Sequence, residues 1–311
     1  MDVLTDVLNG LELKGWLSSR RELTPRWRVA FLASSDSVFH MLRFGAGYIF
    51  VEGEERAIEV GQGDVVFFPR GQAHTICDDP AAPLSYTVPL DHTIGQPYEI
   101  FPSAGGRTDQ ALLCGAFRFE HPGLFPLLHL LPNVIHIPGA HGHMQPAFAA
   151  IVNLIASESA SPQPGRGAVL SRLAELLVIQ MLRVWIEQQD AAATGWLAAL
   201  RDGPIGGAVG LIHQHPERQW KVEELASAVA LSRSAFSARF TQLVGEPPMR
   251  YLTRWRMHCA TRLLKKDSMP TEEIAERLGY ESEGAFRKAF KREVRLTPAQ
   301  YRRRRSASAA G

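Results

Sequence analysis

The chain has 311 residues, of which 45% are hydrophobic, and this is enough for about two domains with ordinary cores. No window approaches the roughly 18 uninterrupted apolar residues of a membrane-spanning helix, and residues 1–15 carry acids rather than the basic start of a secretory signal. Three scattered cysteines are too few for a disulfide framework. These features argue against a membrane protein and a disulfide-rich secreted one, and they predict a cytoplasmic protein with no membrane partner.

Charge is divided unequally along the chain. Residues 211–311 hold 20 Lys and Arg against 11 Asp and Glu, a net charge of +9, whereas residues 1–210 hold 14 against 21, a net charge of −7. A basic C-terminal third suits a polyanion, because cationic side chains that neutralise phosphates release condensed counterions. A solvated charged surface would show the same excess, so charge alone does not establish a DNA partner.

Short runs of β-branched and aromatic residues, separated by Gly and Pro, fill residues 29–119. Such runs stand at 48–51, 65–68 and 86–88. Closely spaced strands with turns between them predict an antiparallel barrel or sandwich. We assign residues 1–140 to this β domain, and because helices follow it, the expected fold class is α+β.

Between residues 145 and 189 the apolar pattern changes to the period of helices. One face collects apolar side chains at spacings of three and four: Leu170, Leu173, Ala174, Leu177, Val178, Met181 and Trp185. This stripe either packs against the barrel or forms the seam of a homodimer, and the sequence favours neither. Residues 141–205 are therefore expected to be a helical linker and dimerisation region, broken at 161–167 and ending in a Gly- and Pro-rich linker at 201–207.

The C-terminal third repeats itself at a period of 50 residues. The recurring positions are Phe236 and Phe286, Phe240 and Phe290, Pro248 and Pro298, and Tyr251 and Tyr301. Just upstream the offset is 49, since Ala226 recurs as Ala275 and Ala230 as Gly279, so the second copy has one extra residue in its turn. Each copy is predicted to be a short helix, a tight turn and a second helix.

The residue types in each copy suit a helix-turn-helix. Ala226 and Ala275 are small enough for two helices to cross closely, and Gly279 suits a turn that needs a positive φ. Ser232 and Ser282 stand where an N-cap would begin each second helix.

Residues 206–305 are assigned to this helical domain, with a disordered tail at 306–311. Residues 249–265 predict one helix between the two copies, about 25 Å long at about 1.5 Å per residue. Successive major grooves on one face of DNA lie about 34 Å apart. A linking helix of that length is expected to let one chain address both grooves.

Each second helix has one apolar face, because its two phenylalanines are four residues apart. The side chains that then face outward are the candidate DNA-binding residues: Arg233, Ser234, Ser237, Ala238 and Gln242 in the first copy, and Glu283, Arg287, Lys288 and Arg292 in the second. In a helix-turn-helix such a face enters the major groove and contacts base edges. A small helical bundle with an ordinary polar surface is the alternative, which the paired repeats and the basic charge disfavour.

Residues 220–303 carry a spaced set of motifs: Glu224-Leu-Ala, Ser232-Arg-Ser-Ala-Phe, Gly279-Tyr-Glu-Ser, Phe286-Arg-Lys-Ala-Phe-Lys-Arg and Thr297-Pro-Ala-Gln-Tyr-Arg. This stretch closely resembles the double helix-turn-helix domain of the AraC/XylS regulators. Arg295 departs from the pattern, because the family usually has glycine there, as Gly245 is after the first copy; we expect a strained left-handed cap or another turn. Gly284 also departs, where a side chain often faces DNA. The resemblance implies double-stranded DNA as a partner, and RNA polymerase if the protein activates transcription.

A second set of residues follows the spacing G-x5-P-x-G-x2-H: Gly63, Pro69, Gly71 and His74. This resembles the second cupin motif, which implies a cupin barrel over about residues 29–119 with His74 pointing into it, where cupins bind metal. The first cupin motif is mostly missing: His40 is present, but Leu42 occupies the place of the second histidine and no glutamate follows at the usual interval. A complete three-histidine, one-glutamate enzyme site is therefore not expected.

Cys114-Gly115 and Arg172-Leu-Ala-Glu-Leu-Leu make the whole chain similar to cupin-containing AraC-type regulators. In those relatives residues matching His40, His74 and Cys114 recur, and some members respond to oxidants through cysteine. Two histidines and a thiolate would suit zinc or another divalent metal, and a metal or a histidinium would lower the pKa of Cys114. Alternatively, His74 satisfies hydrogen bonds in the barrel and Cys114 is a buried small hydrophobe.

Three functions from different classes fit parts of the sequence. A sequence-specific transcription regulator, controlled by a small-molecule, metal or oxidant signal in the barrel, accounts for both halves of the chain. A cupin-type metal-dependent enzyme domain fused to a DNA-binding module is the alternative, and the missing motif residues count against it. An architectural DNA binder needs no base contacts, yet the two outward faces differ, which indicates distinct half-sites. The protein is therefore predicted to be a regulator and not an enzyme.

Overall fold

The computed structural model describes residues 5, 13–89, 99–101, 110–119, 131–139, 146–160, 163–188, 199, 202–264 and 269–309. They fall into two compact units, and each is described by itself. The described residues between 13 and 188 form the β unit, and those from 199 onward belong to the helical unit. None of the described helices is long and apolar enough to cross a membrane.

The β unit contains the strands β1 Leu13–Leu23, β2 Arg28–Phe31, β3 Ser37–Phe44, β4 Gly47–Val51, β5 Ile58–Val60, β6 Val65–Phe68, β7 His74–Cys77, β8 Tyr86–Val88, β9 Glu99–Phe101, β10 Gln110–Phe119 and β11 Ile135–Ile137. One sheet has the order β11-β6-β3-β10-β1-β9 and the other β5-β4-β7-β2-β8. Their facing side chains form one apolar core. The expected antiparallel β-rich cupin-like domain is therefore confirmed, although β1 pairs with β9 and β2 with β8 in parallel.

The strand β1 begins the β unit well before residue 29, the start of the predicted strand region. It pairs antiparallel with β10 along almost its whole length, so that Ser19 lies opposite Cys114. The polar run from Ser18 to Glu22 hides this strand in the sequence. Alternate side chains of that run are nevertheless buried, including Ser19 and Arg21.

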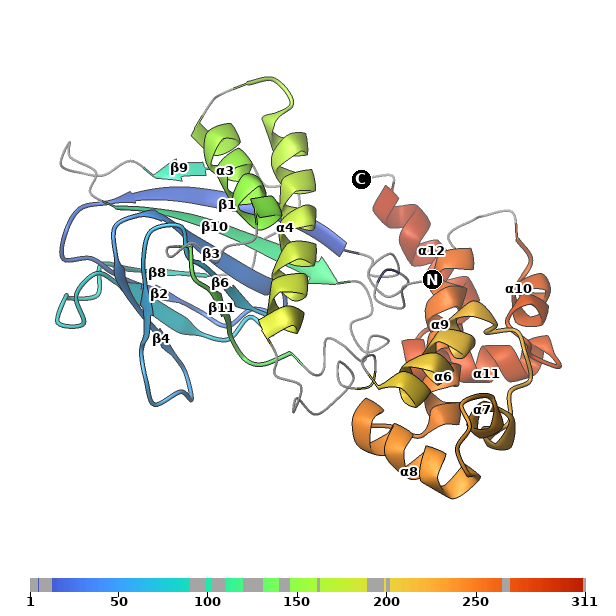
Figure 1. Ribbon diagram of the computed structural model, residues 1–311. Coiled ribbons are helices and arrows are strands. Elements are labelled where there is room, and N and C mark those ends of the chain that lie inside the picture. Colours follow the sequence, from blue (N-terminus) through green and yellow to red (C-terminus); the bar gives the residue numbers. More distant parts are fainter. Residues whose placement is uncertain are drawn as a thin grey trace. The chain divides into compact units, whose positions relative to one another are not determined.

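Two helices, α3 Pro146–Ala160 and α4 Arg166–Gln188, cover the six-stranded sheet on the side away from the apolar core (Figure 1). Leu170, Ala174, Leu177, Val178 and Met181 on α4 are buried. The Ser171 hydroxyl donates to the Gly15 carbonyl of β1 at 2.6 Å. Because α4 packs against β1, β10 and β11 as well as against α3, packing against the barrel is confirmed for this helix, and the dimer seam stays a prediction.

The helical unit contains α6 Gly203–Gln214, α7 Val222–Ala228, α8 Arg233–Val244, α9 Pro248–Leu263, α10 Thr271–Arg277, α11 Glu283–Val294 and α12 Pro298–Ala309. The linking helix predicted at 249–265 is confirmed as α9, which packs against α6, α8 and α11. The helix α12 extends into the stretch where a disordered tail is predicted. Helices α3 and α4 lie within residues 141–205, which are predicted to be a linker region, but they belong to the β unit.

The Gly- and Pro-rich run at 201–207 is predicted as a linker, but α6 begins within it, so the prediction is wrong for residues 203–207. Asp202 caps this helix, because its side chain accepts a hydrogen bond from the Ile205 backbone N–H at 3.0 Å. Pro204 suits the first turn of a helix, where its missing N–H costs nothing. The glycines and the proline of this run therefore begin a helix, where a connecting loop is predicted.

Candidate DNA interface and barrel cluster

The first helix-turn-helix is formed by α7 and α8. The Ser232 hydroxyl accepts from the Ala235 backbone N–H at 3.3 Å, which confirms the predicted cap of α8. Phe236 and Phe240 are fully buried beneath α8. Gly245 ends the helix with a φ of 84°, in the left-handed region that glycine adopts without strain.

The second helix-turn-helix, α10 and α11, repeats this construction. Ser282 caps α11 by accepting from the Ala285 N–H at 3.2 Å, and Phe286 and Phe290 are buried. Arg295 ends α11 with a φ of 65°, so the first of the two expected outcomes, a non-glycine residue in a left-handed cap, is the one observed. An L-residue pays about 1–2 kcal/mol for this conformation.

The two turns need a positive φ at equivalent positions. Gly279 has a φ of 72° and Ala230 a φ of 57°. A Cβ at Gly279 would collide with the Glu217 carbonyl oxygen, so glycine is required there for space as well as for conformation. Ala226 and Ala275 are buried, as expected of small residues at a helix crossing.

The candidate DNA-binding side chains lie on the surface of the helical unit. Seven of them are exposed: Arg233, Ser234, Ala238, Gln242, Arg287, Lys288 and Arg292. Ser237 and Glu283 are partly buried. Their contacts with DNA remain predictions.

All three candidate arginines form ion pairs with carboxylates. Arg233 pairs with Glu223 at 3.0 Å, Arg287 with Glu283 at 2.7 Å and Arg292 with Glu293 at 2.8 Å. Exposed ion pairs of this kind contribute about 0–1 kcal/mol, so they are easily exchanged for other partners.

The barrel cluster consists of His40, His74 and Cys114, which come from β3, β7 and β10. His40 Nδ1 lies 3.2 Å from Cys114 Sγ, and His40 Nε2 lies 2.7 Å from His74 Nε2. His74 Nδ1 lies 2.7 Å from the Gln72 carbonyl oxygen, so His74 donates there and its Nε2 accepts from His40. The three side chains are 2%, 4% and 3% exposed, so the structure brings the predicted residues together as a buried hydrogen-bonded chain.

Burial shifts the pKa values of His74 and Cys114 in the barrel cluster. It lowers the pKa of His74 to about 4, which leaves this side chain neutral at pH 7. It raises the pKa of Cys114 to about 11, even though Arg21 and Ser19 act in the opposite direction. A metal or a histidinium would lower the pKa of Cys114, but in the structure burial outweighs the charge of Arg21 and keeps the thiol protonated.

A single metal ion bound by all three side chains does not fit this arrangement. Cys114 and His74 lie at opposite nitrogens of the His40 ring, and one ion can approach only one of those nitrogens. Two ligands of a tetrahedral zinc, each about 2.0–2.3 Å from the ion, are at least about 3.3 Å apart, farther than the 2.7 Å between the histidine Nε2 atoms. Within the described ranges, no group of three or more His, Cys, Asp and Glu side chains is arranged to hold a metal.

Two nearby residues that act on the pKa of Cys114, Arg21 and Ser19, are missing from the sequence-based site. Arg21 is 9% exposed, and its guanidinium lies 5.3 Å from the centre of the Tyr86 ring. Its charge and hydrogen bonding favour the thiolate form of Cys114, against the effect of burial. Only the pairing of β1 with β10 places Arg21 there, so no local motif could indicate it.

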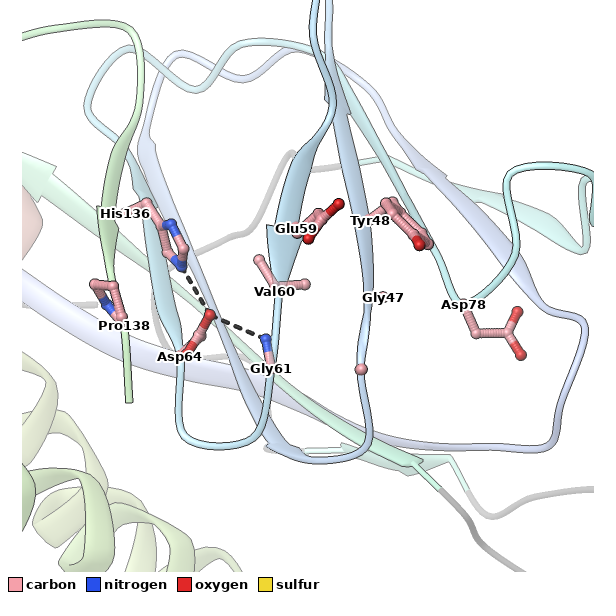
Figure 2. Close-up of a pocket in the computed structure, with 10 residues that line it drawn as sticks. Gly47, Tyr48, Glu59, Val60, Gly61, Asp64, Asp78, His136 and Pro138 are labelled. Atoms are coloured by element: carbon pink, nitrogen blue, oxygen red, sulfur yellow. Dashed lines mark hydrogen bonds and ion pairs between the residues drawn. The ribbon is translucent and has the colours of Figure 1, made fainter. Parts of the chain in front are cut away.

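A separate open pocket of about 460 Å³ is lined by residues of β4, β5 and β11 and of the turns beside them, and none of the predicted site residues lines it (Figure 2). The Asp64 carboxylate lies at its edge, 2.7 Å from His136 Nε2, and accepts from the backbone N–H groups of Gly61 and Gly139. Burial would raise the pKa of Asp64, but these hydrogen bonds outweigh it and hold the pKa below its usual value. The Asp64 side chain thus connects the turn that begins at Gly61 with β11 and the segment just after it.

Comparison with known proteins places the chain in a family. A family described as Cupin matches residues 2–187, and one described as Helix-turn-helix domain matches residues 225–304. An AraC-like transcription regulator of Streptomyces antibioticus is 34% identical, over 97% of this chain and 99% of its own length. This chain belongs to the AraC family of transcription regulators. It has an N-terminal cupin domain and a C-terminal helix-turn-helix domain, as the sequence predicts.

Two further proteins are similar to this AraC-family regulator. The RCS-specific HTH-type transcriptional activator RclR of Escherichia coli (strain K12) is 26% identical over 98% of both chains. The crystal structure of the DNA-binding domain of AdpA in complex with a target DNA covers 34% of this chain and 96% of its own, with 33% identity and a TM-score of 0.33. The similar full-length proteins are transcription regulators, not enzymes.

Proposed function

We propose that this regulator recognises two DNA half-sites, one with α8 and one with α11, and that a signal at the barrel cluster changes its affinity for DNA. The observation that carries the proposal is the pair of serine-capped helices whose exposed faces differ in chemistry. Helices α8 and α11 are built in the same way, yet α8 exposes Ala238 and Gln242 at the positions where α11 exposes Lys288 and Arg292. Different side chains on one frame suit different bases.

Arginine and lysine pair with guanine, and glutamine with adenine, through the major-groove edges of the bases. On DNA, Arg233 and Arg287 would exchange weak pairs with Glu223 and Glu283 for base contacts. The remaining basic excess of the helical unit supports binding to phosphates. A regulator that binds chromosomal DNA in this way would act in the cytoplasm. RNA polymerase is the further partner if the protein activates transcription.

A homodimer is part of the proposal. Leu154 on α3 and Val169 and Leu176 on α4 are large apolar side chains that are 55%, 44% and 48% exposed. Exposed apolar side chains on neighbouring helices suit a protein interface. These three residues, rather than the buried side of α4, are the surface that a second copy would cover.

The signal that the barrel cluster suits best is a small, uncharged, strong oxidant. Hypochlorous acid would oxidise the Cys114 thiol by two electrons to a sulfenic acid, chloride would leave, and the thiol proton would pass to His40 Nδ1. Because the thiolate is the reactive form and the pKa of Cys114 is raised, weak oxidants should react slowly. The relative RclR is named as RCS-specific, which supports a defined chemical signal.

Zinc or another divalent metal is the alternative signal. The low pKa of His74 favours it, because the neutral ring is the form that binds metals. It requires the His40 ring to turn so that one nitrogen and Cys114 Sγ face the same point. Metal analysis of protein purified without a tag tests this alternative independently of the oxidant.

The proposal is tested with the full-length protein and a DNA site that this protein selects from a randomised duplex library. Treatment with hypochlorous acid should change the Kd for the selected site by about tenfold or more in the wild type and in the control C77S, and leave C114S unchanged. Failure to select any sequence would contradict base recognition. An equal response of C114S and wild type would contradict sensing at Cys114.

A further inference from the structure

We infer that Arg256 is a positioning residue that, with Gln219, fixes the spacing at which the two helix-turn-helix units bind DNA. The inference rests on the proposed function, in which α8 and α11 both contact bases. Arg256 lies on α9, between the two units, and does not belong to either outward face. Its side chain is directed at two segments that are far apart in the sequence.

The first of these segments, residues 216–218, leads into α7 of the first unit. Arg256 Nε donates to the Pro216 carbonyl oxygen at 2.6 Å, and Arg256 Nη2 donates to the Arg218 carbonyl oxygen at 2.9 Å. Arg256 is 8% exposed, so both hydrogen bonds form away from bulk water. A planar guanidinium holds two acceptors in a fixed geometry, which an ammonium group cannot do.

The second segment is the turn between α10 and α11 of the second unit. The Arg256 guanidinium lies 5.5 Å from the centre of the Tyr280 ring. Gln219 Nε2, just before α7, donates to the Gly279 carbonyl oxygen. A Cβ at Gly279 would collide with Glu217 and with Arg256 Nη2. The turn of the second unit therefore packs directly against the segment that enters the first unit.

The helix α9 is itself attached firmly to the first half of the helical unit. The Tyr251 hydroxyl lies 2.8 Å from His213 Nε2 on α6, and Trp255 stacks on the same histidine with ring centres 3.6 Å apart. Attachment through one helix fixes the distance between two bodies but resists rotation about that helix weakly. The contacts of Arg256 and Gln219 lie off the α9 axis, so they add the constraint on rotation.

Rotation matters because half-sites on one face of DNA are separated by a full helical turn, about 10–10.5 base pairs. Two rigidly joined units bind together only where both half-sites face them, and correct joining can raise affinity by about 100-fold or more over one unit alone. A more flexible connection between the two units lowers the affinity for half-sites at the correct spacing. It also reduces the loss of affinity when the half-sites are at another spacing. Arg256 thus contributes to the choice of site without contacting a base.

The test uses full-length protein and the site that wild type selects from a randomised duplex library, together with versions in which five base pairs are inserted between or deleted from the half-sites. Wild type should lose about 100-fold in affinity on altered spacing. R256Q should bind the selected site about tenfold more weakly and show a spacing penalty of tenfold or less, with single half-site affinity unchanged. Q219A is the second variant, for the case in which R256Q does not fold, because Gln219 is exposed. It should likewise weaken binding to the selected site and reduce the spacing penalty.

The matched control is R262Q, which removes an exposed arginine from the same helix. It should keep the full spacing penalty, whatever its effect on overall affinity. Wild type that selects no site would contradict the proposed function itself. Wild type that selects a site, with folded R256Q and Q219A keeping the full penalty, would overturn only the role of Arg256.

Discussion

His40 and His74 join the two sheets of the β unit: their Nε2 atoms lie 2.7 Å apart, although β3 belongs to the six-stranded sheet and β7 to the five-stranded one. His74 also stacks on Phe68 with ring centres 3.9 Å apart. A buried polar chain is thus enclosed by aromatic rings between the sheets. Any change in its protonation or covalent state acts on both sheets at once.

Removal of this link should destabilise the β unit. H40L leaves His74 Nε2 buried without its hydrogen-bond donor, which costs about 1–3 kcal/mol. A double-mutant cycle with H40L and H74L, followed by calorimetry of the β unit transition, should give a coupling energy of about 1–2 kcal/mol. Strict additivity of the two substitutions would show that the 2.7 Å contact contributes nothing to stability.

Acid should destabilise the β unit through His74. Its pKa is about 4 in the folded protein and 6.5 in the unfolded chain, so below pH 6.5 the unfolded state binds more protons. Stability is therefore full above about pH 6.5 and falls as the pH drops towards 4, by an amount on the order of 3 kcal/mol. H74F, which keeps an aromatic ring, should be less stable at pH 7 but should lose less on acidification. An equal acid dependence in wild type and H74F would exclude His74 as its source.

The cap of α11 is expected to be improved by glycine. Arg295 holds a φ of 65°, and R295G removes about 1–2 kcal/mol of strain while the unfolded chain gains about 0.5–1 kcal/mol of entropy. The net effect should be a gain of about 0.5–1 kcal/mol for the helical unit, measured by thermal unfolding. The matched change G245A, at a φ of 84°, should destabilise it. A loss of stability in R295G would mean that the arginine side chain makes a compensating contact.

Cys114 should be slow to alkylate at neutral pH. With the pKa raised to about 11 rather than 9, its thiolate fraction is about 100-fold lower, and burial adds to this protection. Iodoacetamide labelling resolved by mass spectrometry should modify Cys259, which is partly exposed, well before Cys114. Labelling of Cys114 first would show that the barrel cluster activates the thiol.

The helical unit could be predicted closely from the sequence because its signals are local. Ser232, Ser282 and the phenylalanine pairs act within one or two helical turns, so a spacing of three or four residues specifies their roles. The Gly-rich run at 203–207 misled for the same reason, since its residue types suit a loop as well as a first helical turn.

The barrel site could be predicted only in part. His74 belongs to a compact motif, and resemblance to known regulators adds His40 and Cys114. The strand β1 and its Arg21 depend on pairing with β10 nearly a hundred residues away, and a polar strand gives no periodic signal strong enough to show it. The protonation states depend on burial, which the spacing of the ligands does not contain.

The most direct test of the central claim is base-by-base specificity of the full-length protein on its selected site. Each base pair is replaced in turn, and the Kd values of wild type, R233A and R287A are compared. Loss of an arginine–guanine contact removes about 1–3 kcal/mol of discrimination. We predict that R233A relaxes specificity in one half-site only and R287A in the other only. Equal weakening on every sequence by both variants would assign these arginines to phosphates and contradict recognition by two distinct helices.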